Sequence, residues 1–150
     1  MVSIQASSPT LQKIRSPSQR TLLQVEDNPA NAAVVNQLIE RRSDLNLLTA
    51  TNGHQGIEMA CAFQPDLILM DMKMPGMSGL AAVAILRGNP ATAHIPVIAL
   101  SSNAYPNEIK QCLEAGVYRY LTKPYKITDL MTAIDTALLH AAENSPMTEC

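Results

Sequence analysis

This sequence of 150 residues lacks a large excess of charge of one sign, long apolar runs and a secretory leader. The formal net charge is only −2 and no block of like charge occurs, so the basic surface that attracts nucleic acid is absent and DNA is disfavoured as a direct partner. The longest apolar runs, such as Leu80–Leu86, are far below the roughly 18–20 residues that cross a bilayer. The amino-terminal stretch has no apolar signal region. We therefore expect a cytoplasmic protein without a membrane segment.

Cysteine is also scarce. Cys61, Cys112 and Cys150 are odd in number and do not have the spacing of metal ligands. Thiols of this kind are usually reduced and packed in the interior of a protein. We expect Cys61 and Cys112 to be packed in helices.

The length and the hydrophobic content of 47% suit one domain with a single core. Residues 1–19 are rich in Ser, Pro and Gln without hydrophobic periodicity, which predicts a disordered leader or a linker. Residues 20–142 form the predicted domain, and residues 143–150 a C-terminal tail.

Within this domain, short apolar runs alternate strictly with helical patterns. The expected strands are Leu22–Val25, Leu45–Thr49, Leu67–Met70, Val97–Leu100 and Tyr118–Leu121. The expected helices are Pro29–Arg41, Gly53–Phe63, Leu80–Leu86, Pro106–Ala115 and Thr128–Ala142. This alternation specifies an α/β fold with a doubly wound, five-stranded parallel sheet.

Polar residues follow four of the expected strands directly. In a sheet of this kind ligands bind beyond the carboxyl ends of the strands. The residues at those ends are Glu26 and Asp27, Asp71, Ser101 and Ser102, and Lys123 with Pro124. Each signal alone has a structural explanation, because an acidic pair after a strand often caps a helix and a Lys-Pro pair is usually a solvated loop. Their joint placement at one edge predicts a functional site.

Three carboxylates at one edge repel each other unless a cation intervenes. With Lys123 protonated, Glu26, Asp27 and Asp71 leave two excess negative charges, which one Mg²⁺ would neutralise. We therefore expect a Mg²⁺ site, which Mn²⁺ could also occupy.

The expected roles follow from position. Asp71, central and backed by an apolar strand, is the natural nucleophile toward phosphorus and would form an aspartyl phosphate. Glu26 and Asp27 would hold the metal, Lys123 would neutralise developing charge, and Ser101 would donate a hydrogen bond to a phosphoryl oxygen. Since no residue is placed to activate a water, the phosphorylated protein should have an appreciable lifetime.

Four motifs, in order, resemble the receiver domains of two-component response regulators, including those fused to hybrid histidine kinases. The motifs are "LLQVEDNPAN", "LILMDMKMPGMSG", "IPVIALSSNA" and "YRYLTKPY", and the resemblance covers about Thr21–Ala141. It implies the flavodoxin-like receiver fold. It also implies a signalling phosphoacceptor rather than an enzyme, which takes a phosphoryl group on Asp71 from the phosphohistidine of a histidine kinase or histidine phosphotransfer protein and loses it slowly by autodephosphorylation.

By the same resemblance, Asp27, Asp71 and the backbone carbonyl of Lys73 would be direct metal ligands, with Glu26 acting through water. Ser101 would move toward the phosphoryl group and Tyr120 would turn inward, which changes the face of the fourth helix, fifth strand and fifth helix for a downstream protein partner. The Lys123–Pro124 peptide bond would be cis.

Departures from the family pattern are modest. Ser78, Ser101 and Ser102 replace residues more common at their positions, and Ser101 keeps the hydroxyl that switching needs. Lys73 and Asn103 lie two residues beyond Asp71 and Ser101, where the family's side chains influence dephosphorylation. We expect Lys73, Asn103 and Ser102 to modulate the site, and Lys73 to alter the lifetime of the phosphoryl group.

Other functions remain open alternatives at this point. A haloacid-dehalogenase-type phosphohydrolase would need a second Asp where Lys73 stands, and a flavin binder would need a phosphate loop where "EDNPAN" presents carboxylates. A Rossmann dinucleotide site lacks its glycine motif. A degenerate receiver that acts only as an interaction module is the main alternative. The sequence also leaves open whether the domain stands alone or belongs to a hybrid kinase.

Overall fold

The computed structural model describes residues 19–143. The predicted leader and tail lie outside this range except for Gln19 and Glu143. The strands are β2 (Arg20–Val25), β3 (Leu45–Ala50), β4 (Leu67–Asp71), β5 (Val97–Ser101) and β6 (Arg119–Thr122). The helices are α2 (Pro29–Glu40), α3 (Gly53–Phe63), α4 (Gly79–Gly88), α5 (Pro106–Glu114) and α6 (Ile127–Glu143).

The strands form one parallel sheet in the order β3-β2-β4-β5-β6. The order departs from the sequence order because the chain winds in one direction from β2 to β3 and then returns past β2 to β4. Val25 pairs with Met70, and Asp71 pairs with Leu100. This is the predicted α/β fold, and its switch point lies between β2 and β4.

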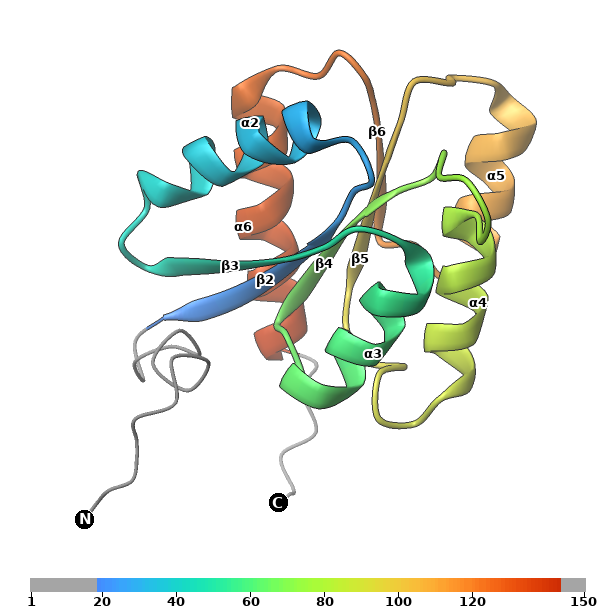
Figure 1. The fold of residues 1–150 in the computed structure, drawn as a ribbon, viewed down its shortest axis with the longest axis horizontal. Coiled ribbons are helices and arrows are strands. Elements are labelled where there is room, and N and C mark those ends of the chain that lie inside the picture. Colours follow the sequence, from blue (N-terminus) through green and yellow to red (C-terminus); the bar gives the residue numbers. More distant parts are fainter. Residues whose placement is uncertain (1–18, 144–150) are drawn as a thin grey trace.

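Two hydrophobic layers cover the sheet, with α2 and α6 on one face and α3, α4 and α5 on the other (Figure 1). The strand residues alternate between them: Leu22, Leu67 and Leu69 pack with α2 and α6, whereas Leu23, Ile68 and Met70 pack with α3, α4 and α5. All six are at most 1% exposed. Because both faces are covered, the central strands are continuous apolar runs rather than alternating ones.

Local capping residues fix where several helices begin. Asn28 accepts hydrogen bonds from Ala30 and Asn31 N–H groups ahead of Pro29, the first residue of α2. Ser78 accepts one from Ala81 at the start of α4. Such caps satisfy N–H groups that have no partner within the helix.

The path of the chain puts both ends of the described domain at the same edge of the sheet (Figure 1). β2 begins at this edge, and α6, which runs antiparallel to the strands, ends there. The loops that follow β2, β4, β5 and β6 lie at the opposite edge.

Contrary to our expectation, Cys61 does not pack in the interior. Its side chain is exposed, whereas Cys112 is buried as predicted. The reason is the helical period: Ala60 occupies the core-facing position of α3, so its neighbour Cys61 faces away. The Cys61 Sγ accepts a hydrogen bond of 3.5 Å from Asn89 Nδ2.

Among residues 19–143, no helix combines the length and apolar character that a membrane span requires.

Candidate functional site

The polar residues singled out from the sequence meet at one edge because the strands that carry them are neighbours in the sheet. Glu26 and Asp27 follow β2, Asp71 ends β4, Ser101 ends β5 and Lys123 follows β6. β2, β4, β5 and β6 are adjacent in that order and parallel. Parallel strands bring their carboxyl ends to the same edge.

Three carboxylates form the centre of this site. One oxygen of each of Glu26, Asp27 and Asp71 lies within 4.8 Å of the others. Glu26 and Asp71 are 6% and 5% exposed, and Asp27 is exposed. A compact set of carboxylate oxygens, open to solvent on one side, suits a hard divalent cation that keeps some of its waters, as Mg²⁺ does.

Lys123 provides the positive charge of the site. Its Nζ lies 3.3 Å from Glu26 Oε1 and 3.7 Å from Asp71 Oδ1. Burial raises the pKa of Glu26, and the neighbouring Asp71 carboxylate raises it further, while the Asn28 N–H and Lys123 oppose the rise. Three carboxylates thus gather around one ammonium, and their crowding disfavours the charged form of Glu26.

The backbone also holds the two buried carboxylates in place. The N–H of Asn28 donates to Glu26 Oε2 at 3.2 Å, and the N–H of Lys73 donates to Asp71 Oδ1 at 3.1 Å. The Lys73 side chain is exposed. These bonds hold one oxygen of each of the two buried carboxylates.

The loop after Asp71 requires a glycine at its end. A Cβ at Gly79 would lie 2.8 Å from the Asp71 carbonyl oxygen and 2.7 Å from the Met72 Cα, closer than such contacts occur. The methionines of this segment pack on the core side of α3 and α4: Met70 and Met74 are buried in that cluster, and Met72 and Met77 are partly buried against it.

Ser101 and Tyr120 are connected through the backbone of Asn103. The Ser101 side chain is 1% exposed, and its Oγ accepts the Asn103 N–H at 3.1 Å, which leaves the hydroxyl hydrogen free to donate elsewhere. The half-buried Tyr120 donates its hydroxyl hydrogen to the Asn103 carbonyl oxygen at 2.7 Å. Ser102 is exposed, and the Lys123–Pro124 peptide bond is cis.

A groove of about 470 Å³, which the sequence did not indicate, runs from the site between α2 and the start of α6. Glu26, Ser102 and Lys123 line its polar end. Val34 and Ile127 are 52% and 55% exposed along it. In the sequence, the only local sign of this surface is the apolar pair of Val34 and Leu38, one helical turn apart. Such a pair is equally typical of a helix face that packs against the core.

The sequence matches the model of the response regulator receiver domain over residues 22–135. The chain is 36% identical over 118 residues to the nitrate/nitrite response regulator protein NarL of Escherichia coli, covering 78% of this chain and 54% of that protein. It is 36% identical over 104 residues to the signal transduction histidine-protein kinase BarA of the same species, covering 69% of this chain and 11% of that protein. It thus spans about half or less of these curated relatives.

Among solved structures, the chain is similar to the receiver domain of a sensor histidine kinase from Pseudomonas aeruginosa, with a magnesium ion coordinated in the active site cleft of that protein. The TM-score is 0.74 at 30% identity, over 80% of this chain and 98% of that one. The match of the family model extends from β2 into α6 and so includes every element that carries the site. The chain belongs to the family of response regulator receiver domains.

Proposed function

We propose that this domain accepts a phosphoryl group on Asp71 from a phosphohistidine of a histidine kinase or histidine phosphotransfer protein. The observation that carries the proposal is the setting of the Asp71 carboxylate. It is 5% exposed, lies 3.7 Å from the Lys123 ammonium, and is within 4.8 Å of oxygens of Glu26 and Asp27. A carboxylate in such a setting is a nucleophile whose charged product can be neutralised.

In the proposed transfer, an Asp71 oxygen forms a bond to phosphorus while the bond between phosphorus and the donor's imidazole nitrogen breaks. The imidazole leaves with the electron pair of that bond, so the donor regains its histidine. Lys123 neutralises charge on the phosphoryl oxygens, and Ser101 donates its free hydroxyl hydrogen to one of them.

We assign a Mg²⁺ site to the carboxylates of Glu26, Asp27 and Asp71 and the backbone carbonyl of Lys73, with Mn²⁺ as a substitute. The excess negative charge around one ammonium supports this assignment, as does the magnesium in the cleft of the related kinase receiver domain. When bound, the ion supplies positive charge that offsets repulsion between the carboxylates and the incoming phosphoryl oxygens.

The groove between α2 and the start of α6 is the surface where we expect the phosphohistidine donor to dock. It combines the exposed apolar side chains of Val34 and Ile127 with the polar end at Lys123. Exposed apolar surface that leads to a charged site suits a protein partner whose reactive group must reach that site. This transfer would occur in the cytoplasm.

We further propose that phosphorylation alters the face formed by α5, β6 and α6. If Ser101 turns toward a phosphoryl group, its Oγ no longer accepts the Asn103 N–H, and the carbonyl that holds the Tyr120 hydroxyl shifts with it. Tyr120 can then turn inward. The change would reach α5 because Tyr120 lies on β6, against which α5 packs.

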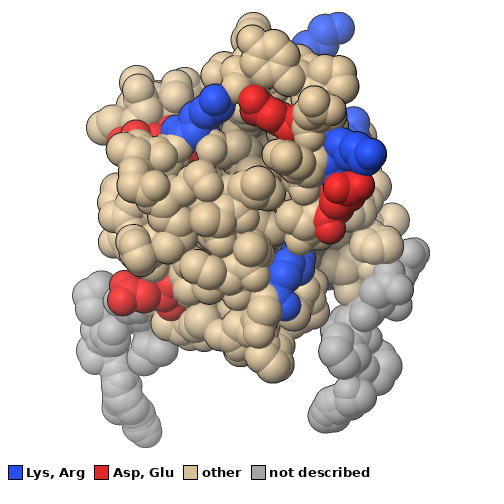
Figure 2. All heavy atoms as spheres, turned by 90° about the vertical axis from the view of Figure 1, so that its right-hand side faces the viewer, with Lys and Arg blue, Asp and Glu red and all other residues tan. Residues whose placement is uncertain are grey.

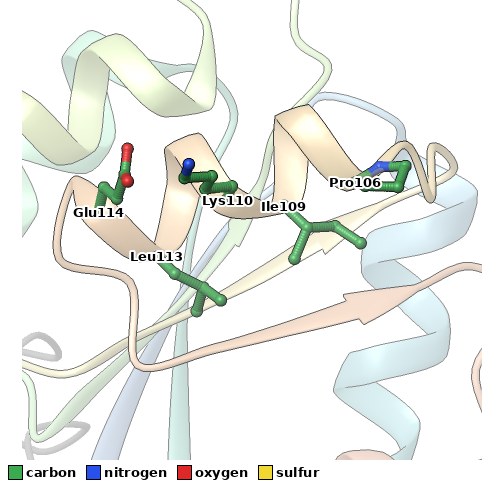
Figure 3. Close-up of a pocket in the computed structure, with 5 residues that line it drawn as sticks. All are labelled: Pro106, Ile109, Lys110, Leu113 and Glu114. Carbon is green, nitrogen blue, oxygen red and sulfur yellow. The ribbon is translucent and has the colours of Figure 1, made fainter.

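The surface of α5 supports a protein partner on this face. Figure 3 shows Ile109 and Leu113 projecting from one side of α5, where they line a hollow of about 530 Å³. Figure 2, which looks onto the side of the domain where α4 and α5 lie, shows charged atoms of both signs scattered around a largely uncharged area. A face of this kind favours a protein over nucleic acid.

The test is labelling with radioactive acetyl phosphate, a small-molecule phosphodonor, with Mg²⁺ and after its removal by EDTA. We expect the wild type to be labelled only with the metal and Asp71→Asn not to be labelled. Asp44→Asn, which alters an exposed carboxylate at the opposite edge of the sheet, should be labelled like the wild type. Equal labelling of Asp71→Asn would show that another residue is the acceptor.

If the wild type is labelled neither by acetyl phosphate nor by a phosphorylated histidine phosphotransfer protein, the domain is a degenerate receiver that acts only through protein contacts. The lifetime of the label measures the slow autodephosphorylation that we also propose.

A further inference from the structure

Three hydrogen-bonding groups of Asn103 each contact a different residue of the domain. Its N–H donates to Ser101 Oγ at 3.1 Å, and its carbonyl oxygen accepts from the Tyr120 hydroxyl at 2.7 Å. Its side-chain Nδ2 donates to the Glu108 carboxylate, at 3.2 Å to Oε1 and 3.4 Å to Oε2. Asn103 therefore connects the end of β5 with the first turn of α5.

Glu108 accepts a hydrogen bond from Asn103 and not the capping hydrogen bond that is common for a glutamate at its position in a helix. It is the third residue of α5, from which a glutamate commonly reaches back to the backbone N–H of the N-cap residue. Here the N-cap residue Tyr105 makes no side-chain cap hydrogen bond, and the carboxylate reaches two residues further back, to Asn103. This contact ties the helix to the loop that leaves the site.

We propose that Glu108 is a positioning residue that restrains the Asn103 carboxamide, through its hydrogen bond to Nδ2, while Asp71 carries a phosphoryl group. The inference rests on the proposed phosphorylation of Asp71. Asn103 is on the loop that leaves β5 beside the carboxyl end of β4, so a released carboxamide shares the edge of the sheet with a phosphoryl group on Asp71.

The consequence concerns hydrolysis of the aspartyl phosphate. In that step a water oxygen bonds to phosphorus, the bond from phosphorus to the Asp71 oxygen breaks, and the carboxylate leaves with the electron pair. The proton passes to solvent, and inorganic phosphate departs. A free carboxamide can orient the attacking water through its oxygen, as glutamine does in other phosphoryl-transfer sites. Restraint of Asn103 by Glu108 therefore lengthens the life of the phosphoryl group.

The test compares the half-life of the label in Mg²⁺ after removal of the phosphodonor. Glu108→Ala should shorten it about three- to tenfold, the effect expected from losing one hydrogen bond. Glu108→Gln keeps an acceptor oxygen for Asn103 Nδ2 and should restore most of the half-life. Glu114→Ala, which removes an exposed carboxylate at the other end of α5, should leave it unchanged.

A double-mutant cycle separates this role from general stabilisation of α5. Asn103→Ala removes the carboxamide, so adding Glu108→Ala to it should change nothing further. Asn103→Asp breaks the same contact by repulsion from Glu108 while it keeps an acceptor oxygen, and it should also shorten the half-life.

Two results would overturn the inference while the proposed function stands. One is a labelled Glu108→Ala protein with the wild-type half-life, and the other is a Glu108→Ala effect that persists in full beside Asn103→Ala. Failure of the wild type to be labelled would instead overturn both.

Discussion

The ammonium of Lys123 lies 3.3 Å from Oε1 of Glu26, although 97 positions of the sequence separate these residues. Their strands are not neighbours, because β4 and β5 lie between β2 and β6. The lysine side chain thus reaches across the carboxyl ends of both central strands and comes within 3.7 Å of Asp71. One cation therefore faces two buried carboxylates.

Lys123→Ala should slow phosphorylation of Asp71 by about 10²- to 10³-fold, the cost of removing one charged donor from a site where negative charge develops. The initial rate of labelling by acetyl phosphate measures this effect. Lys126→Ala removes an exposed ammonium three residues further on and serves as the control. An equal loss in both variants would mean that the general positive charge of this loop matters rather than the position of Lys123.

Mg²⁺ should stabilise the folded domain, since it binds a cluster that exists only after folding. At a concentration one hundred times the dissociation constant the gain is about 2.7 kcal/mol. Without metal, Asp71→Asn should be more stable than the wild type because one of three crowded carboxylates is gone, and it should gain less from Mg²⁺. Thermal denaturation with and without the ion tests both statements. A metal effect of the same size in the two proteins would exclude Asp71 as a ligand.

Lys73→Ala should change the half-life of the phosphoryl group by more than about twofold, because an exposed ammonium two residues beyond Asp71 alters the electrostatic potential there. The backbone N–H that holds Asp71 Oδ1 remains in this variant, so the position of the carboxylate is kept. The decay of the label after removal of the donor is the measurement. An unchanged half-life would rule out a modulating role for this side chain.

Arg87→Lys should lower the free energy of unfolding by about 1–3 kcal/mol. The Arg87 guanidinium donates to the carbonyl oxygens of Gly116, Ala93 and Ile95 at distances from 2.8 to 3.2 Å. Lysine keeps the charge but lacks the planar fork that serves these three acceptors. Urea denaturation measures the loss, with Arg41→Lys on the surface as the control, and equal stability of the two variants would contradict the prediction.

Arg42 joins the loop before β3 to α6, and its contribution should depend on pH. It donates to Asp44 at 2.8 and 2.9 Å and to Asp135 at 2.9 Å. The hydrogen bonds that Arg42 donates to Asp44 hold the pKa of Asp44 below its ordinary value of 3.8. Since the folded pKa is the lower one, the stabilisation is complete above the unfolded pKa and is lost as the pH falls through the folded one.

Arg42→Gln should therefore cost under about 1 kcal/mol at neutral pH, because the groups are largely exposed. The difference from the wild type should shrink below pH 3.8, the ordinary pKa of Asp44. Urea denaturation at neutral and at acid pH checks this. A difference that stays constant with pH would assign the effect to packing of the arginine stem.

The order and type of the elements could be predicted from residues close together in the sequence, because periodicity and caps are local. The ends of strands were less accessible. β2 begins at Arg20 rather than at Leu22 because Arg20 and Thr21 pair with Leu45 and Asn46, and β4 includes Asp71 because it pairs with Leu100. Pairing partners far along the chain set these limits.

The carboxylates, Ser101 and Lys123 were found because each follows a strand directly, so the topology brings them together. Glu108 lies within a helix, and its contact with Asn103 depends on how α5 is oriented over the loop. The available signal was an acidic third residue in a helix whose N-cap, Tyr105, has no short polar side chain to cap with. The surface position of Cys61 was missed because a short helix with small residues leaves its buried side ambiguous.

The start of β2 and the end of α6, at Arg20 and Glu143, both lie on the side of the domain remote from Asp71 (Figure 1). A fluorophore, an affinity tag or a complete neighbouring domain attached there would leave the approach of a phosphodonor unobstructed. The same arrangement would let a domain of this kind be joined to other domains in a larger signalling protein. The edge of the sheet that carries Asp71 would stay exposed, whichever domain is attached at the opposite edge.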